Sequence, residues 1–133
     1  MKMRADRMEG QNAIARYGPD GVVVGASQYT ESVIVPWQGA VQRWQATSFE
    51  SLTVEHFAQL AALAPELVIF GSGSRIRFAA PALMRPLIDA RIGFETMDTA
   101  AACRTYNVLH AEGRPVVAAL LFGPVGPGRP AGV

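Results

Sequence analysis

The pattern of hydrophobic and polar positions divides the chain into an N-terminal part that favours strands and a C-terminal part in which strands and helices alternate. In the first part, strands are predicted over residues 11–16, 22–25, 32–36 and, as a short element, 41–44. The first two are joined by a turn at residues 17–21, and the third ends at Pro36, which cannot donate to a ladder. Residues 28–31 are polar and are expected to connect strands.

Helical spacing of apolar residues predicts three helices, over residues 53–63, 81–91 and 98–112. Thr53 and Asp98 are candidate N-caps, and Pro86 is tolerated only in the first turn of its helix. Apolar runs predict strands over residues 66–70, 92–97 and 116–122. This alternation indicates right-handed crossovers and parallel neighbouring strands, with the N-terminal strands either extending the sheet or packing on it as a hairpin layer.

Length and composition narrow the class of protein. A chain of 133 residues, half of them hydrophobic, favours one soluble domain, which we expect over residues 10–122. Residues 1–9 are expected to be flexible, and residues 123–133, rich in glycine and proline, to form a disordered tail. The charged N-terminus and the interruption of the longest apolar run at Gly123 predict a cytoplasmic protein without a membrane span. A net charge of +1 gives no general attraction to nucleic acid.

The residues that could carry chemistry are few. Cys103 is the single cysteine, and with only His56 and His110 beside it the sequence predicts neither a disulfide nor a metal site. Gly71 and Gly73 follow a predicted strand, but Ile76 stands where a dinucleotide-binding loop needs its third glycine. We therefore expect no cofactor and assign no catalytic residue.

A candidate binding site follows from topology, because ligands of open α/β sheets sit beyond the carboxyl ends of parallel strands. Two loops meet this condition, and with the next helix they supply the candidate residues Gly71, Ser72, Gly73, Ser74, Arg75, Asp98 and Thr99. Backbone amides and the Arg75 guanidinium would then suit an anion or a partner's carboxylate. In the alternative interpretation the glycines serve only the turn and Arg75 is solvated.

The third predicted helix has an apolar face and a polar one. Its packing face is expected to comprise Ala102, Cys103, Tyr106 and Leu109. Arg104 and Asn107 share another face, from which they could contact a partner, although bonding to nearby loop carbonyls is favoured.

The cysteine, one histidine and the two tryptophans could be either structural or functional residues. Cys103 is interpreted as a packing residue rather than a nucleophile, although a folded contact with His56 stays open. His110, near the helix C-terminus, is expected at the surface. Trp37 and Trp44 are interpreted equally well as core residues or as anchors for a partner.

The segment Phe94-Glu-Thr-Met-Asp-Thr99, followed by Thr105-Tyr-Asn-x-Leu109 and Glu112-Gly-Arg-x-Val116, resembles a family of small domains of unknown biochemical function. That family includes a mitochondrial respiratory complex I assembly factor and many short bacterial proteins, and the resemblance covers about residues 11–122. It implies a three-layer α/β fold with a mixed central sheet, in which the final strand runs antiparallel to others. It also implies no established catalysis. Ser72 stands where the family often has threonine, and the tail from Gly123 has no recognised counterpart.

Three functional hypotheses follow. The leading one is a non-enzymatic protein-binding or assembly factor with an unidentified protein partner. The alternative is a small-molecule or anion-binding protein, with or without catalysis, that uses the crevice at residues 71–75 with Asp98, Thr99, Arg104 and Asn107. The third is a homo-oligomer with an interface around an exposed Trp37.

Overall fold

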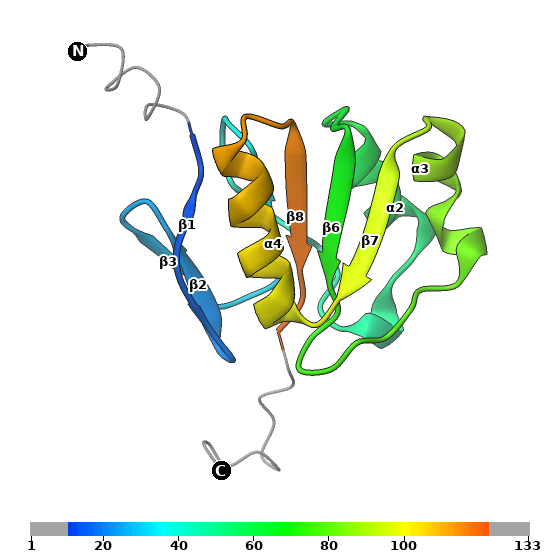
Figure 1. The fold of residues 1–133 in the computed structure, drawn as a ribbon. Coiled ribbons are helices and arrows are strands. Elements are labelled where there is room, and N and C mark those ends of the chain that lie inside the picture. The colour runs from blue at the N-terminus through cyan, green and yellow to red at the C-terminus, as the bar shows by residue number, and fades with distance from the viewer. Residues whose placement is uncertain (1–10, 123–133) are drawn as a thin grey trace, which may run out of the picture.

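The computed structural model describes residues 11–122 and has the three-layer α/β architecture that the resemblance implied (Figure 1). The strands are β1 (Ile14–Gly18), β2 (Gly21–Val24), β3 (Ser27–Tyr29), β4 (Val33–Pro36), β5 (Gln42–Arg43), β6 (Leu67–Gly71), β7 (Gly93–Met97) and β8 (Val116–Leu120). The helices are η1 (Phe49–Ser51), α2 (Val54–Ala61), η2 (Pro81–Met84), α3 (Arg85–Asp89) and α4 (Thr99–Ala111). The predictions for residues 1–9 and 123–133 concern residues outside the described range.

The N-terminal strands form a sheet of their own, so the hairpin-layer alternative is correct. β1, β2 and β3 pair in that order, antiparallel throughout. The sequence prediction missed β3, because its polar residues form a strand only through pairing with β2, which puts Tyr29 opposite Val22. The first strand also begins later than predicted, at Ile14, and extends into the expected turn as far as Gly18.

The central sheet is mixed and has the order β5-β4-β8-β6-β7. β6 lies between β7 and β8 and is parallel to both, as the alternation of strands and helices predicts. β8 is antiparallel to β4, and β4 is antiparallel to β5. The final strand therefore runs antiparallel to β4 but parallel to β6, which limits the expectation drawn from the resemblance.

Two core clusters fill the two faces of this sheet because successive side chains of a strand point to opposite sides. Val116, Ala118 and Leu120 of β8 pack in the cluster that contains the buried residues of α4 and of the N-terminal sheet. Val117 and Ala119 pack in the other cluster, with the buried residues of α2 and α3. The central sheet is thus the middle layer, and Figure 1 shows α4 in front of it and α2 behind it.

The helices form where the sequence predicts them, with one difference. Thr53 and Asp98 are the N-caps of α2 and α4, and the Asp98 carboxylate accepts a hydrogen bond from the backbone N–H of Ala101. The predicted helix over residues 81–91 is divided into η2 and α3, because Pro86 has no N–H and can occupy only the start of a new α-helix. No helix within residues 11–122 is long and apolar enough to cross a membrane.

Candidate functional site

A cleft of about 510 Å³ opens at the carboxyl ends of β6 and β8. Four segments of the chain line it: residues 30–32 before β4, the segment from Arg43 at the end of β5 to Glu50, the loop from Ser72 to Arg77, and Leu121–Phe122 after β8. Parallel strands end together at this edge, which is the edge of the sheet that the topological argument selected. Ser72, Gly73, Ser74 and Arg75 all line the cleft.

The loop that begins at Gly71 packs tightly against the start of α4. A Cβ at Gly71 would lie 2.9 Å from Thr99 Oγ1 and 3.0 Å from Thr99 Cα, so this position needs glycine. Gly73 has a φ of 113°, a backbone conformation that side chains disfavour. Both glycines therefore have a clear structural reason.

The Ser72 hydroxyl closes the loop. It is buried, donates to the carbonyl of Arg75 at 2.8 Å and accepts from the backbone N–H of Arg77 at 2.9 Å. The backbone N–H of Ser72 donates to the carbonyl of Met97 at 2.9 Å. These bonds make residues 72–77 a compact loop whose centre, Ser74 to Ile76, is exposed.

Thr99 connects this loop to α4 and β8. Its hydroxyl accepts from the backbone N–H of Gly73 at 2.9 Å and donates to the carbonyl of Leu121, and its own N–H donates to the carbonyl of Gly73. The amides of Gly73 and Thr99, two of those that the sequence analysis offered to an anion, are therefore bonded within the protein. Of the groups named there, the Arg75 guanidinium forms no hydrogen bond or ion pair with another described residue.

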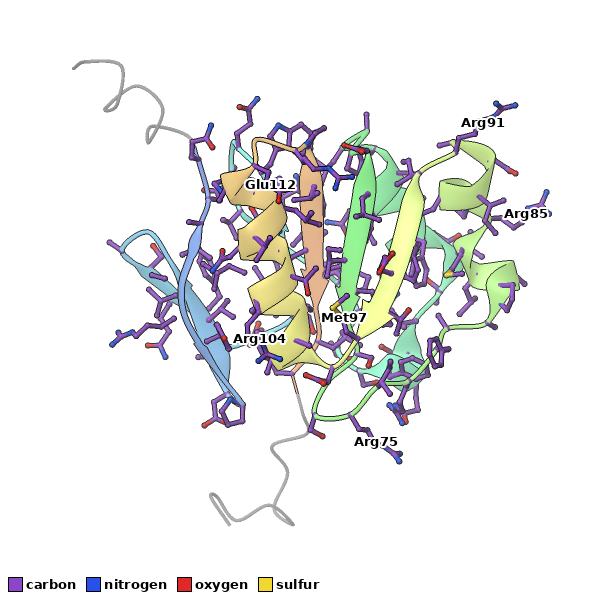
Figure 2. The ribbon with its side chains drawn as sticks, in the orientation of Figure 1. Arg75, Arg85, Arg91, Met97, Arg104 and Glu112 are labelled. Carbon is purple, nitrogen blue, oxygen red and sulfur yellow. The ribbon has the colours of Figure 1, made fainter. Side chains whose placement is uncertain are left out.

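Arg104 and Asn107 lie further along α4 and do not line the cleft. The Asn107 side chain accepts from the backbone N–H of Ile14 and donates to its carbonyl, both at 2.9 Å, which joins α4 to β1. This is the bonding to backbone that the sequence analysis favoured. Arg104 is exposed, and Figure 2 shows it well separated from Arg75. Thr99 contacts the loop and Asp98 caps α4, whereas Arg104 and Asn107 belong to a different part of the surface.

Sequence reasoning missed the charged walls of the cleft. Glu31 forms an ion pair with Arg43, and Glu50 accepts a hydrogen bond from Arg77 at 2.9 Å. The Arg77 guanidinium lies 4.3 Å from the centroid of the Phe49 ring, which it covers. No periodic or motif signal marks these residues, because their segments meet only in the folded chain: the pairing of β4 with β5 brings Arg43 close to Glu31, and Arg77 reaches Glu50 across 27 positions of the sequence.

Electrostatics follow from these pairs. The hydrogen bond from Arg77 lowers the pKa of the Glu50 carboxyl, with smaller contributions that include the positive charge of Arg75. Arg75 and Glu50 both line the cleft. Glu31 and Glu50 are each paired with one arginine, Arg43 and Arg77, and Arg75 adds one further positive charge.

The remaining reactive residues are committed to packing or to backbone bonds. Cys103 is buried in α4, and burial raises the pKa of its thiol to about 12. His56 Nδ1 accepts from the backbone N–H of Thr53 on the other side of the central sheet, so the open question of a Cys103–His56 contact is answered in the negative. The packing interpretation of Cys103 is correct.

His110 and the tryptophans lie deeper than an exposed surface role requires. The surface role predicted for His110 is wrong: its side chain is half-buried, its Nε2 is 3.1 Å from the carbonyl oxygen of Trp37, and its ring packs against Tyr106. Trp44 is a fully buried core residue. Trp37 is half-buried against the core rather than exposed.

Several known proteins resemble this chain in sequence, and several solved structures resemble it in fold. Proteins named NADH dehydrogenase (ubiquinone) 1 alpha subcomplex assembly factor 3 are 34% identical over 115 residues in Bos taurus and 33% identical over 104 residues in Mus musculus. These matches cover 85% and 77% of the chain, but only 62% and 55% of the two relatives.

Solved bacterial structures match nearly the whole described chain. A crystal structure of a Bordetella parapertussis protein has a TM-score of 0.80 and 36% identity, and the match covers 86% of this chain and 98% of the other. A solution structure from Bordetella pertussis, described as an Mth938-like domain, has a TM-score of 0.74 and 31% identity over 83% and 85% of the two chains. The model of a family described as proteins of unknown function, DUF498/DUF598, matches residues 14–121. These findings confirm the resemblance seen in the sequence, and the chain belongs to the DUF498/DUF598 family.

Proposed function

We propose that this chain is a non-enzymatic assembly factor that binds proteins of a respiratory NADH dehydrogenase during their assembly. The names of the curated relatives support this role, and the match to them covers 85% of the chain in the Bos taurus case. Those relatives are longer than this chain, and the match covers 62% of the Bos taurus protein. We therefore propose for this chain only a contact with a protein partner, which the shared residues can make.

The observation that carries the proposal is the apolar surface of the loop between β6 and η2. Phe78 is 71% exposed and Ile76 is 49% exposed on this loop. Removing a phenylalanine side chain from water contributes about 1.5–3 kcal/mol of favourable free energy, which is comparable to the contribution of a hot-spot residue to binding.

The bonding of the reactive side chains favours a binding role over catalysis. A nucleophilic cysteine needs a thiolate, whereas the Cys103 thiol has a pKa of about 12 and stays protonated at neutral pH. His56 and His110 contact backbone atoms through ring nitrogens, Thr53 N–H in one case and the Trp37 carbonyl in the other. Each of these groups has a structural task.

The setting of this role follows the sequence expectations that stay predictions. We place the protein in the cytoplasm, where it would bind membrane-bound assembly intermediates at the cytoplasmic side of the membrane. Its partner is expected to be a protein rather than a nucleic acid. Self-association is a further prediction, which sedimentation at high concentration tests: a monomer at every concentration contradicts it.

The test is affinity purification of the tagged protein from detergent-solubilised membranes of its own cells, with mass spectrometry for NADH dehydrogenase subunits. The wild-type protein is expected to retain these subunits, and the amount retained by Phe78→Ser is expected to be lower by at least about tenfold. Val108→Ser is the matched control, because Val108 is 58% exposed on α4, away from the loop. No subunit above background in the wild type, or equal retention by Phe78→Ser, contradicts the proposal.

A further inference from the structure

The cleft lies at the boundary between the parallel and antiparallel parts of the central sheet. β8 is parallel to β6 on one side and antiparallel to β4 on the other. Residues Leu121–Phe122, which follow β8, therefore meet the segment that enters β4 and the loop that leaves β6. The parallel strands β6 and β8 both end at this cleft, and open α/β sheets bind ligands beyond the carboxyl ends of their strands. A volume of about 510 Å³ is within the range of small-molecule sites.

The charges of the cleft select the sign of a ligand. Three arginines and two glutamates line it, and each glutamate is paired with one arginine. Arg75 forms no ion pair within residues 11–122, so the lining carries one positive charge whose partner is absent from this part of the chain. A ligand with a single negative charge would balance it.

Apolar and hydroxyl groups form the rest of the lining. Phe49 and Phe122 supply carbon surface, and Arg77 holds the Phe49 ring in place by covering one face. Thr47 and Ser74 are exposed beside this surface and offer hydroxyl groups. A bound molecule can therefore place an apolar body against the rings while its charged group stays near Arg75.

The backbone of the loop decides between a carboxylate and a phosphate. Phosphate sites use several backbone donors and a free helix N-terminus. Here the N–H of Gly73 is bonded to Thr99 Oγ1, and the N–H groups of Thr99 and Ala101 are bonded to the carbonyl of Gly73 and to the Asp98 carboxylate. These three amides are thus used within the protein, and the planar guanidinium of Arg75, which lines the cleft, matches the two oxygens of a carboxylate.

We propose that this cleft binds a small carboxylic acid with an apolar body, with the Arg75 guanidinium on the carboxylate and Phe49 and Phe122 against the hydrocarbon. The site is independent of the assembly role. It also differs from the site predicted from the sequence, since the walls at residues 43–50 and 121–122 replace Arg104 and Asn107.

The experiment is a titration of the isotope-labelled protein with octanoate, followed by two-dimensional amide NMR. We expect shifts confined to the cleft segments, and affinity that rises from hexanoate to octanoate by up to about fourfold per methylene. Octanamide has nearly the same shape without the charge, acetate has the charge without the body, and inorganic phosphate tests the other anion class. All three are expected to bind at least about tenfold more weakly than octanoate.

The matched variants are Arg75→Ala and Arg104→Ala, two exposed arginines of which only Arg75 lines the cleft. Arg75→Ala is expected to weaken octanoate at least about tenfold while its spectrum stays folded, and Arg104→Ala to bind as the wild type does. The proposal is overturned by equal binding of octanoate and octanamide, by tighter binding of phosphate, by shifts outside the cleft, or by an Arg75→Ala variant with unchanged affinity.

Discussion

Replacing Thr99 with valine tests whether one buried hydroxyl holds the candidate site to the rest of the fold. Thr99 is 5% exposed, and its hydroxyl bridges the N–H of Gly73 and the carbonyl of Leu121. Valine keeps the shape of the side chain but leaves both backbone groups without this partner, in a place that water does not reach. Each lost bond costs about 1–2 kcal/mol when the remaining group is buried, so Thr99→Val is expected to destabilise the protein by about 2–4 kcal/mol.

The same substitution also crowds the loop. The valine methyl would stand where the hydroxyl now lies 2.9 Å from the Gly73 nitrogen, closer than a carbon atom tolerates, and Gly71 is already in close contact with Thr99. If the loop does not move, the loss of stability in Thr99→Val is therefore larger than the loss of the two hydrogen bonds alone. For a domain of this size each kcal/mol lowers Tm by roughly 4 °C, which gives a decrease of about 8–16 °C.

Urea unfolding followed by fluorescence of the buried Trp44 measures this change, because unfolding transfers its indole from the core to water. Thr105→Val is the control: Thr105 is half-buried on the same helix, its side chain forms no hydrogen bond with residues 11–122, and its loss is expected to change the free energy of unfolding by less than about 0.5 kcal/mol. If Thr99→Val lies within about 0.5 kcal/mol of the wild type, the hydroxyl bridge does not support the loop.

Four further predictions concern other parts of the chain. Asn107→Ala removes both hydrogen bonds between α4 and β1, so stability should fall by about 2 kcal/mol and amide exchange in β1 should accelerate; unchanged exchange refutes this link. Ala64 has a φ of 51°, so Ala64→Gly should raise the urea midpoint, and a lower midpoint contradicts the inferred strain. The Cys103 thiol, with a pKa of about 12, should react with Ellman's reagent at pH 8 only after urea unfolds the protein. The hydrogen bond from Arg77 lowers the pKa of Glu50 in the folded state, so its stabilising effect is present at neutral pH and declines as pH falls below 4.5; an NMR titration should show the midpoint of Glu50 rising toward 4.5 in Arg77→Met.

The sequence predicts elements well where the signal is local. A threonine or aspartate before an apolar period located α2 and α4, and the packing face of α4 was correct at Ala102, Cys103 and Tyr106. The prediction was less successful where pairing or proline decides. β3 has no period of its own, and Pro86 divides one predicted helix into two elements.

The candidate site shows the same limit. Its loop, Ser72 to Arg75, follows from one strand end and could be found by topology. Its opposite walls could not, because Glu31 and Glu50 come from segments whose meeting depends on the order of five strands. Nor does the sequence reveal that two amides at the start of α4, those of Thr99 and Ala101, already donate to the Gly73 carbonyl and to the Asp98 carboxylate.

Arg75 and Phe78 lie three residues apart on one loop, yet the bonds of that loop separate their tasks. The Ser72 hydroxyl ties the carbonyl of Arg75 and the N–H of Arg77 together, and the Arg77 side chain is fixed by Glu50. Arg75 is thus presented from the closed part of the loop, and Phe78 emerges beyond it. Phe78→Ser should consequently leave octanoate affinity unchanged, because none of the bonds that shape the cleft passes through Phe78. A loss of octanoate binding in that variant would mean that the loop behaves as one mobile unit and that partner and ligand compete for it.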